Sequence, residues 1–187
     1  YGLCEDESVV GTMFYIMDMV EGRILWDATL PDYQPTERRA IFDAKVSTFA
    51  ALHNVDWKAA GLEGFGKEGD YIARQIHRWT KQYQMSETSK IPEMDKLIEW
   101  LPKNIPPGER TTIVHGDYRI DNMILHPTEP KVIAVLDWEL STLGDPLADF
   151  TYHLMSWQMP SSDPVRPSLA DVTDKEAKGI PTQDQYV

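Results

Sequence analysis

The sequence contains almost nothing that could cross-link the chain. Cys4 is its single cysteine, so no internal disulfide can form, and no Cys/His cluster has zinc-ligand spacing. No apolar run approaches the ~18 residues of a membrane helix, and the N-terminus lacks the basic-then-apolar order of a secretory signal. We therefore expect a cytoplasmic protein with no membrane partner, stabilised by packing alone.

Positive charge is also scarce. With 18 Lys and Arg against 30 Asp and Glu, the formal net charge of −12 repels a polyanion, and no dense basic stripe offsets it. We expect no nucleic-acid partner. A nucleotide remains compatible, because one magnesium ion and a few local cations can hold it. The 187 residues, 42% of them hydrophobic, predict one compact unit.

What the sequence does contain is a polar motif between apolar segments. Asp117 is followed five positions later by Asn122, and a second carboxylate, Asp137, ends a strand-like run. A kinase-type site needs this combination, because a base must face the acceptor hydroxyl while amide and carboxylate oxygens hold magnesium on the nucleotide phosphates. The motif therefore predicts a phosphoryl-transfer centre.

Hydrophobic periodicity predicts that one strand and three helices precede this motif. Residues 9–20, rich in β-branched, aromatic and methionine residues, predict a buried strand. Helices are expected from an N-cap at Thr36 to His53, over residues 72–83, and from 92 to 101. The tryptophans in or near helical segments are expected to pack in the core: Trp57, Trp79, Trp100 and Trp157.

A β-hairpin is expected directly after the motif. Strands at 112–114 and 123–125 flank the polar loop, and a proline turn leads into a strand at 132–136. The hairpin would bring Asn122 and Asp137 to one end, where both can touch one ion. Asp145 is then expected to cap a helix with Pro146 at its first position. Its expected inward residues are Leu147, Phe150, Leu154 and Trp157, and residues 160–167 are expected to form a loop.

At these residues the chain resembles the aminoglycoside phosphotransferase and choline kinase-like family, a branch of the protein kinase fold. The resemblance rests on H-G-D-x-x-x-x-N at residues 115–122, on L-D-W-E at 136–139 and on G-D-P-L-A-D at 144–149. More narrowly, residues 15–23, 79–83 and 136–144 resemble the phosphotransferase-like domain that, in some proteins, is associated with an acyl-CoA dehydrogenase.

The resemblance implies an α+β, protein kinase-like fold in two parts. Residues 1–22 would be the end of the N-terminal lobe and the hinge strand, and residues 23–187 the helical C-terminal lobe with the catalytic loop and metal-binding hairpin. The family's glycine-rich loop, phosphate-binding lysine and helical glutamate have no counterpart here. We therefore expect an incomplete chain, with the N-terminal lobe largely missing and negligible kinase turnover in isolation.

Carried over residue by residue, the resemblance implies that Asp117 is the catalytic base and that Asn122 and Asp137 are magnesium ligands. Ile124 and Leu136 would form an apolar floor beneath the adenine. The hinge, whose backbone binds the adenine edge, would be Met17, Asp18, Met19 and Val20.

The expected function is that of a magnesium- and ATP-dependent kinase with a small-molecule hydroxyl acceptor. The resemblance to the dehydrogenase-associated branch suggests a hydroxyacyl-CoA, and a homodimer is left open. One alternative is a catalytically silent kinase-like module that binds nucleotide or a partner protein. A weaker alternative is a metal-dependent phosphohydrolase that uses Asp117 and Asp137.

Several polar residues near the motif are expected to have structural roles. His115 is expected to brace the backbone, and Asp149 to anchor the motif loop from the following helix. For Arg119 two possibilities stay open: it could meet a phosphate or acidic substrate group, or pair with Asp121 or Asp149.

Overall fold

The computed structural model describes residues 2–108, 110–162 and 167–187 and has an α+β architecture, as predicted. Its helices are α1 (Pro35–His53), α2 (Tyr71–Ser86), α3 (Pro92–Trp100), α4 (Pro146–Gln158) and α5 (Gln183–Tyr186). Its strands are β1 (Gly2–Cys4), β2 (Phe14–Ile16), β3 (Thr112–Val114), β4 (Met123–Leu125), β5 (Val132–Val135) and β6 (Thr142–Gly144).

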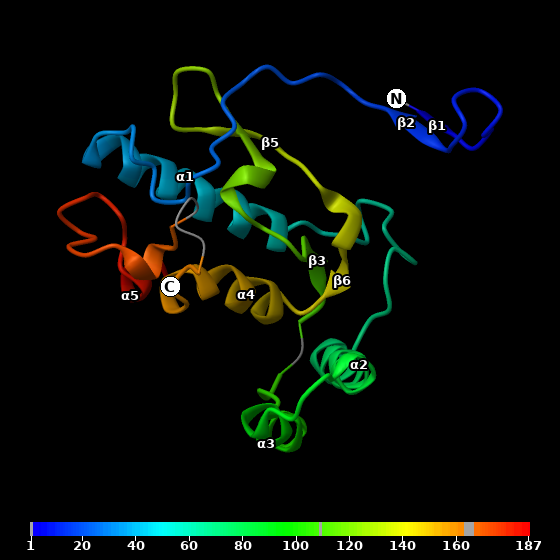
Figure 1. Ribbon diagram of the computed structural model, residues 1–187. Coiled ribbons are helices and arrows are strands. Elements are labelled where there is room, and N and C mark those ends of the chain that lie inside the picture. The colour runs from blue at the N-terminus through cyan, green and yellow to red at the C-terminus, as the bar shows by residue number, and fades with distance from the viewer. Residues whose placement is uncertain (1, 109, 163–166) are drawn as a thin grey trace.

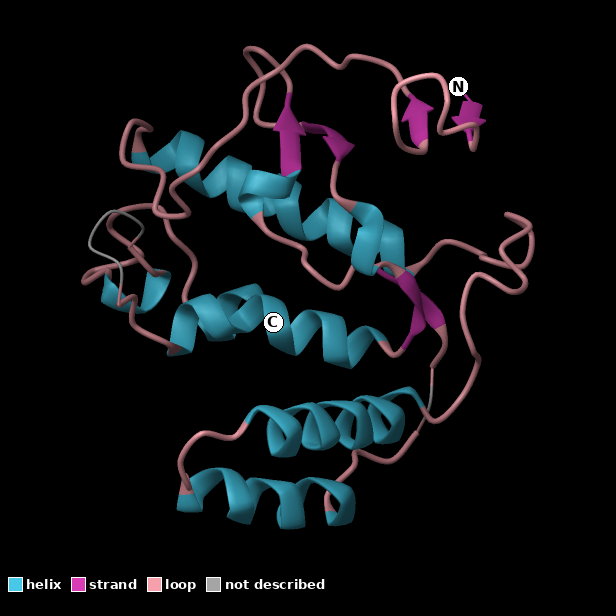
Figure 2. Ribbon diagram, turned by 45° about the vertical axis from the view of Figure 1, so that its right-hand side comes forward, coloured by secondary structure: helices cyan, strands magenta, loops and turns pink. Residues whose placement is uncertain are grey.

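Helices contain more of the chain than strands do. Helices α1 and α4 run across its middle, the α2–α3 pair lies below them, and the β1–β2 hairpin projects to one side (Figures 1 and 2). Within the described ranges, no helix is both long and apolar enough to cross a bilayer.

The strands pair only in twos within the described chain, and every pair is antiparallel: β1 with β2, β3 with β6, and β4 with β5. The β4–β5 hairpin confirms the prediction, with Met123 opposite Val135. The sequence did not predict β6, because its single large apolar residue, Leu143, stands between a threonine and a glycine and forms no apolar run like those of β3 and β4.

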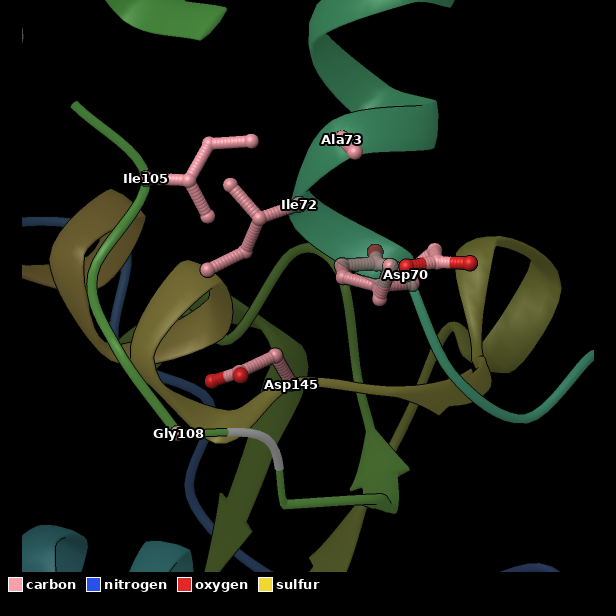
Figure 3. Close-up of a pocket in the computed structure, with 7 residues that line it drawn as sticks. Asp70, Ile72, Ala73, Ile105, Gly108 and Asp145 are labelled. Atoms are coloured by element: carbon pink, nitrogen blue, oxygen red, sulfur yellow. The ribbon is translucent and has the colours of Figure 1, made fainter. Parts of the chain in front are cut away.

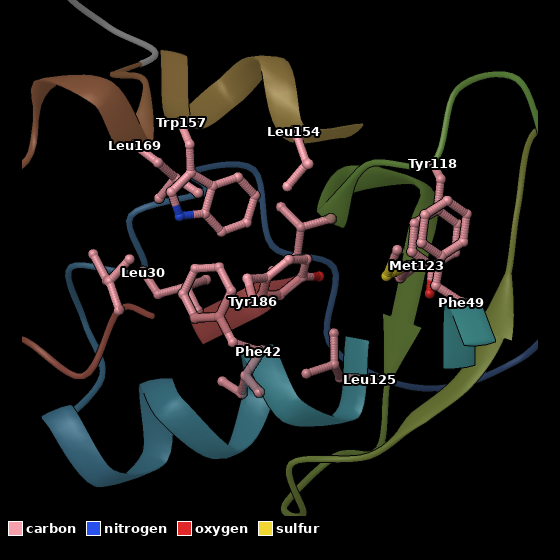
Figure 4. Close-up of a cluster of buried hydrophobic side chains, with 13 residues drawn as sticks. Leu30, Phe42, Phe49, Tyr118, Met123, Leu125, Leu154, Trp157, Leu169 and Tyr186 are labelled. Carbon is pink, nitrogen blue, oxygen red and sulfur yellow. The ribbon is translucent and has the colours of Figure 1, made fainter. Parts of the chain in front are cut away.

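A single large core joins α1 and α4 to the motif and β4 (Figure 4). Ile41, Lys45 and Phe49 lie four residues apart on the buried side of α1. The ring of Phe49 stacks on that of Tyr118, with centroids 4.0 Å apart and planes at 6°. Because Tyr118 belongs to the polar motif, the motif loop is held by hydrophobic packing as well as by hydrogen bonds.

The predicted buried strand over residues 9–20 is wrong. Residues 14–16 form β2, but this strand pairs with β1 in an exposed hairpin. Tyr15 is 69% and Met19 is 89% exposed. An apolar composition favours burial only where another element lies against it, and the hairpin projects from the body of the described chain (Figure 1).

Other local expectations need correction. Gln34, not Thr36, precedes α1, and the Glu37 carboxylate accepts a hydrogen bond from the Gln34 N–H at 3.1 Å. The predicted core positions of Trp79, Trp100 and Leu147 are wrong, since all three are exposed, whereas Trp57, Trp157 and Leu154 are buried as predicted. Trp79 and Trp100 belong to α2 and α3, which have no buried residue, and Leu147 lies in the first turn of α4.

Candidate active site

The motif loop is anchored by one buried carboxylate, Asp149 of α4. Its oxygens accept hydrogen bonds from the backbone N–H groups of His115 (2.8 Å) and Gly116 (2.9 Å) and contact His53 Nε2 at 3.0 Å. Asp149 is 4% exposed, so these bonds compensate the burial of its charge. The predicted anchoring role of Asp149 is confirmed.

His115 is wholly buried and bonded on two sides. Its Nε2 lies 2.8 Å from the carbonyl oxygen of Leu136, and its Nδ1 accepts the N–H of Asp117 at 3.2 Å. The acceptor role of Nδ1 assigns the proton to Nε2, which donates to Leu136. His115 therefore ties the loop to the end of β5, and its predicted bracing role is confirmed.

Asp117 stands at the opening of this anchored loop. Its Oδ1 accepts a hydrogen bond from the Tyr152 hydroxyl at 3.2 Å and lies 3.3 Å from Arg119 Nε, while its Oδ2 accepts from Asn122 Nδ2 at 3.1 Å. Its side chain keeps 19% of its surface exposed. The carboxylate is thus held in one orientation while remaining accessible, as a general base requires.

Arg119 pairs with acidic residues inside the loop, which confirms the predicted pairing with Asp121. Its Nη2 donates to Asp121 at 2.9 Å, and its Nε faces Asp117. Half of its side chain is exposed, so solvent screens both pairs and they contribute little to stability.

Asn122 faces Asp117 from the end of the short helical turn Ile120–Asn122. Its amide nitrogen donates to the Asp117 carbonyl at 2.9 Å as well as to the carboxylate. This use of the nitrogen leaves the carboxamide oxygen for another partner, and an oxygen of this kind is a ligand that magnesium accepts.

The hairpin places Asn122 and Asp137 at the same end, as predicted. The N–H of Leu136 donates to the Asn122 carbonyl at 2.8 Å, and Asp137 is the next residue. Asp137 is exposed and adopts a left-handed backbone with φ of 63°. Residues other than glycine seldom take this conformation, and where they do it often marks a functional position.

The motif loop also packs on the turn after Asp137. Gly116 has φ of 85°, and a Cβ at its position would lie 2.9 Å from the carbonyl oxygen of Leu140. Only glycine combines this backbone with this close approach. The motif loop at Gly116 and the turn that follows Asp137 are therefore in direct contact.

The segment expected to be the hinge runs into the hairpin. Residues 17–20 lie outside regular structure, directly after β2, and are exposed. Arg23 then exchanges two backbone hydrogen bonds with Leu125, at 2.8 and 2.9 Å. A Cβ on Gly22 would lie 2.4 Å from Ile124 Cγ2, so the hinge-side chain passes directly over Ile124.

The two residues expected beneath the adenine lie on the same face of this hairpin. Met123 and Val135 pair with each other and pack on the core. Side chains alternate along a strand, so the next residues, Ile124 and Leu136, face the opposite side. This is the side over which Gly22 passes.

Sequence reasoning missed Tyr152, whose hydroxyl contacts Asp117. Burial, followed by the charge of Asp117, raises the pKa of Tyr152, so the hydroxyl stays a proton donor at neutral pH. A signal was present: Tyr152 lies three residues after Asp149 on α4, and such residues share a helix face. Residues contacting the motif loop were therefore to be expected at that spacing.

The donor set fits a hard cation. In the described ranges no group of three or more His, Cys, Asp and Glu side chains is arranged for a metal. Magnesium on a nucleotide needs less than this, because phosphates and water supply most ligands beside one or two protein oxygens. Asn122 and Asp137 offer two such oxygens.

A separate cavity of about 310 Å³ lies near the start of α2 (Figure 3). Ile72 and Ile105 line it together with Asp145. The Asp145 side chain caps α4, because it accepts a hydrogen bond from the Leu147 N–H at 2.8 Å. The predicted cap is therefore confirmed. None of the predicted site residues lines this cavity, so we assign it no chemistry.

Comparison with known proteins identifies the family and agrees with the fold. The phosphotransferase enzyme family matches residues 1–178, and the chain belongs to this family. It is 50% identical over 184 residues to acyl-CoA dehydrogenase family member 10 of Mus musculus and 43% identical over 185 residues to family member 11 of Homo sapiens. Each match covers 98% of the chain, but the chain spans only 17% and 23% of the two relatives.

Solved structures match as well. A crystal structure described as a candidate aminoglycoside phosphotransferase from Ralstonia eutropha JMP134 is 54% identical, with a TM-score of 0.92 over all of this chain and 56% of that one. An aminoglycoside-3′-phosphotransferase of type VIII is 19% identical, with a TM-score of 0.55 over 89% of this chain and 55% of that one. At that identity the second match shows the fold alone.

Proposed function

We propose that this chain carries the catalytic loop and metal ligands of a magnesium- and ATP-dependent phosphotransferase that transfers the γ-phosphoryl group to a small-molecule hydroxyl. The observation that carries the proposal is the direct hydrogen bonding of Asn122 to Asp117, at the hairpin end from which Asp137 emerges. Membership of the phosphotransferase enzyme family supports it.

Asp117 is the proposed general base. Tyr152 and Asn122 orient its carboxylate, and its exposed surface lets an acceptor hydroxyl approach. Asn122 and Asp137 are the proposed magnesium ligands. When bound, magnesium would neutralise charge on the β- and γ-phosphates. The protein's own contribution is then mainly positioning of the base and the nucleotide.

Nucleotide binding is proposed at the hinge side of the hairpin. The backbone of Met17, Asp18, Met19 and Val20 would bind the adenine edge. Ile124 and Leu136, which share the hairpin face beneath Gly22, would form the apolar floor. In support, this face carries apolar side chains and lies next to the proposed metal ligands.

The acceptor is proposed to be an alcohol. Two relatives are named as acyl-CoA dehydrogenase family members, which makes a hydroxyacyl-CoA a specific candidate. Nothing in the loop requires a covalent intermediate, because the base, the metal ligands and the nucleotide face suffice for direct transfer to a hydroxyl.

The test is calorimetry with magnesium and ATP on the intact gene product, together with turnover measurements. Asp137→Asn should weaken magnesium-dependent nucleotide binding at least ~10-fold, because a charged ligand is lost. Asp117→Asn should bind nucleotide almost as wild type does but lose roughly 10²–10⁴-fold in turnover. Glu139→Gln, an exposed carboxylate in the turn after Asp137, is the matched control and should change neither.

The outcomes separate the alternatives. Unchanged binding and turnover in both variants would refute the assignments. Nucleotide binding without transfer to any hydroxyl would favour the silent module. ATP consumption without an acceptor, at a rate rivalling transfer, would favour a phosphohydrolase.

A further inference from the structure

A cavity of about 260 Å³ lies directly beside the catalytic loop. Four consecutive loop residues, 118–121, form one wall, and Tyr152 and His153 of α4 form another. Lys45 of α1 and Trp26, from the segment before α1, also line it. No proposed magnesium or adenine contact lies among its lining residues.

Lys45 is the unusual member of this lining. The residue is 4% exposed, and among the described residues its ammonium group has no hydrogen bond and no ion pair within 4.0 Å. Lysines are almost never this buried unless they are paired, because an unpaired charge loses its hydration without compensation. Asp121 acts on Lys45 only electrostatically, and burial still lowers the pKa of Lys45 to about 7.

The polar groups around Lys45 are already occupied. His153 Nδ1 faces the Tyr118 carbonyl at 2.9 Å, and His153 Nε2 faces the Tyr186 hydroxyl at 3.0 Å. The Tyr118 hydroxyl donates to the backbone carbonyl of Lys45 at 2.8 Å. The protein thus leaves an unpaired amine in the wall of a cavity, which is a natural site for an anionic ligand.

The cavity is connected to the proposed base. Arg119 and Tyr152 line it, and both also contact Asp117 Oδ1, at 3.3 and 3.2 Å. A molecule whose hydroxyl reaches Asp117 at this edge can therefore extend into the cavity toward Lys45.

We propose that this cavity binds the phosphoryl acceptor and that Lys45 binds an anionic oxygen group, a carboxylate or a phosphate, on that acceptor. The inference rests on the proposed phosphotransferase function and narrows its substrate class to hydroxy compounds that carry a negative charge. Polycationic acceptors are disfavoured, because Arg119 already offsets the charge of Asp121, which lines the same cavity, and the unpaired Lys45 would repel them.

The test measures binding separately from turnover, on the intact gene product with magnesium and a non-hydrolysable ATP analogue. The probes are 3- and 4-hydroxybutyrate, their uncharged methyl esters, and their coenzyme A thioesters. Calorimetry gives the affinity of each probe, and quenching of Trp26 fluorescence reports occupation of the cavity, confirmed by loss of the signal in Trp26→Phe.

Lys45→Met keeps the length and apolar stem of the side chain and removes its charge. It should weaken binding of the anionic probe at least ~10-fold while changing methyl ester and nucleotide binding less than about two-fold. Lys45→Arg should restore part of the affinity. Lys58→Met, at a largely exposed lysine, is the control and should bind all probes as wild type does.

Dependence of the free acids on Lys45 identifies a carboxylate as the anion, and dependence of only the thioesters identifies a phosphate. Unchanged affinity of all anionic probes in Lys45→Met overturns the inference, as does failure of every probe to bind wild type. Lys45-dependent binding without any phosphoryl transfer keeps the pocket assignment and refutes the proposed function instead.

Discussion

The side-chain amide of Asn122 donates two hydrogen bonds to Asp117, at 2.9 Å to its backbone carbonyl and at 3.1 Å to its carboxylate. The proposed metal ligand therefore also orients the proposed base. A substitution at Asn122 therefore affects both the metal site and the orientation of the base. Its effect on stability depends on whether it introduces a charge.

Asn122→Asp should destabilise the fold by about 3 kcal/mol, because it replaces a buried donor with a second carboxylate against Asp117. Magnesium should recover more of the lost thermal stability in Asn122→Asp than in Asn122→Ala, since a cation relieves repulsion between carboxylates. Thermal melts with and without magnesium measure this. An equal magnesium response in the two variants would contradict a cation site at Asn122.

Asp149→Ala should cost on the order of 3–5 kcal/mol of unfolding free energy. It leaves the N–H groups of His115 and Gly116 without their acceptor in a buried loop. Urea denaturation measures the loss. Asp43→Ala, which removes an exposed ion pair with Arg39, should cost less than about 1 kcal/mol, and similar losses at both sites would argue against the anchoring role.

Lys45→Met should be more stable than wild type at pH 7, by on the order of a few kcal/mol. Burial lowers the pKa of Lys45 from 10.5 to about 7, so between these pH values the unfolded chain binds a proton that the native state does not. Wild-type stability should therefore rise with pH across this window relative to the variant, and the difference should narrow toward pH 10.5.

Urea denaturation of both proteins between pH 6 and 10 tests this dependence. The other groups facing Lys45 are common to the two proteins: Asp121, Arg119, Tyr118, Tyr152 and His153. A stability difference that does not vary with pH would show that Lys45 keeps an ordinary pKa.

Gly22→Ala should destabilise the join between the hinge segment and the hairpin by roughly 1–3 kcal/mol. The added Cβ would lie 2.3 Å from the Leu125 carbonyl oxygen, so the backbone must move and strain the Arg23–Leu125 hydrogen bonds. Nucleotide affinity of the intact protein should fall with it. Gly2→Ala, where no atom lies within 4 Å, is the control and should leave both quantities unchanged.

The hairpin was predictable because its information is local. A polar motif, two short apolar runs and a proline turn are enough to predict that Asn122 and Asp137 meet at one end, and the pairing of Met123 with Val135 confirms it. The Asp145 cap was predictable for the same reason, since a capping side chain bonds to an N–H two residues away.

The exposure of Tyr15 and Trp79 was not predictable. An apolar side chain is more stable when buried, but the rest of the fold determines whether another element packs against it. The contact of Tyr152 with Asp117 was not predictable either, because it joins residues 35 positions apart and depends on how α4 packs against the loop.

By itself, the sequence determined the family and the residues proposed for the chemistry, because a carboxylate, a carboxamide and a second carboxylate at set spacings can be recognised from the sequence. Only the tertiary structure decided what surrounds them. An unpaired ammonium at Lys45 arises where α1, α4 and the motif loop converge, and its energetics depend on burial and on neighbours that no local pattern encodes.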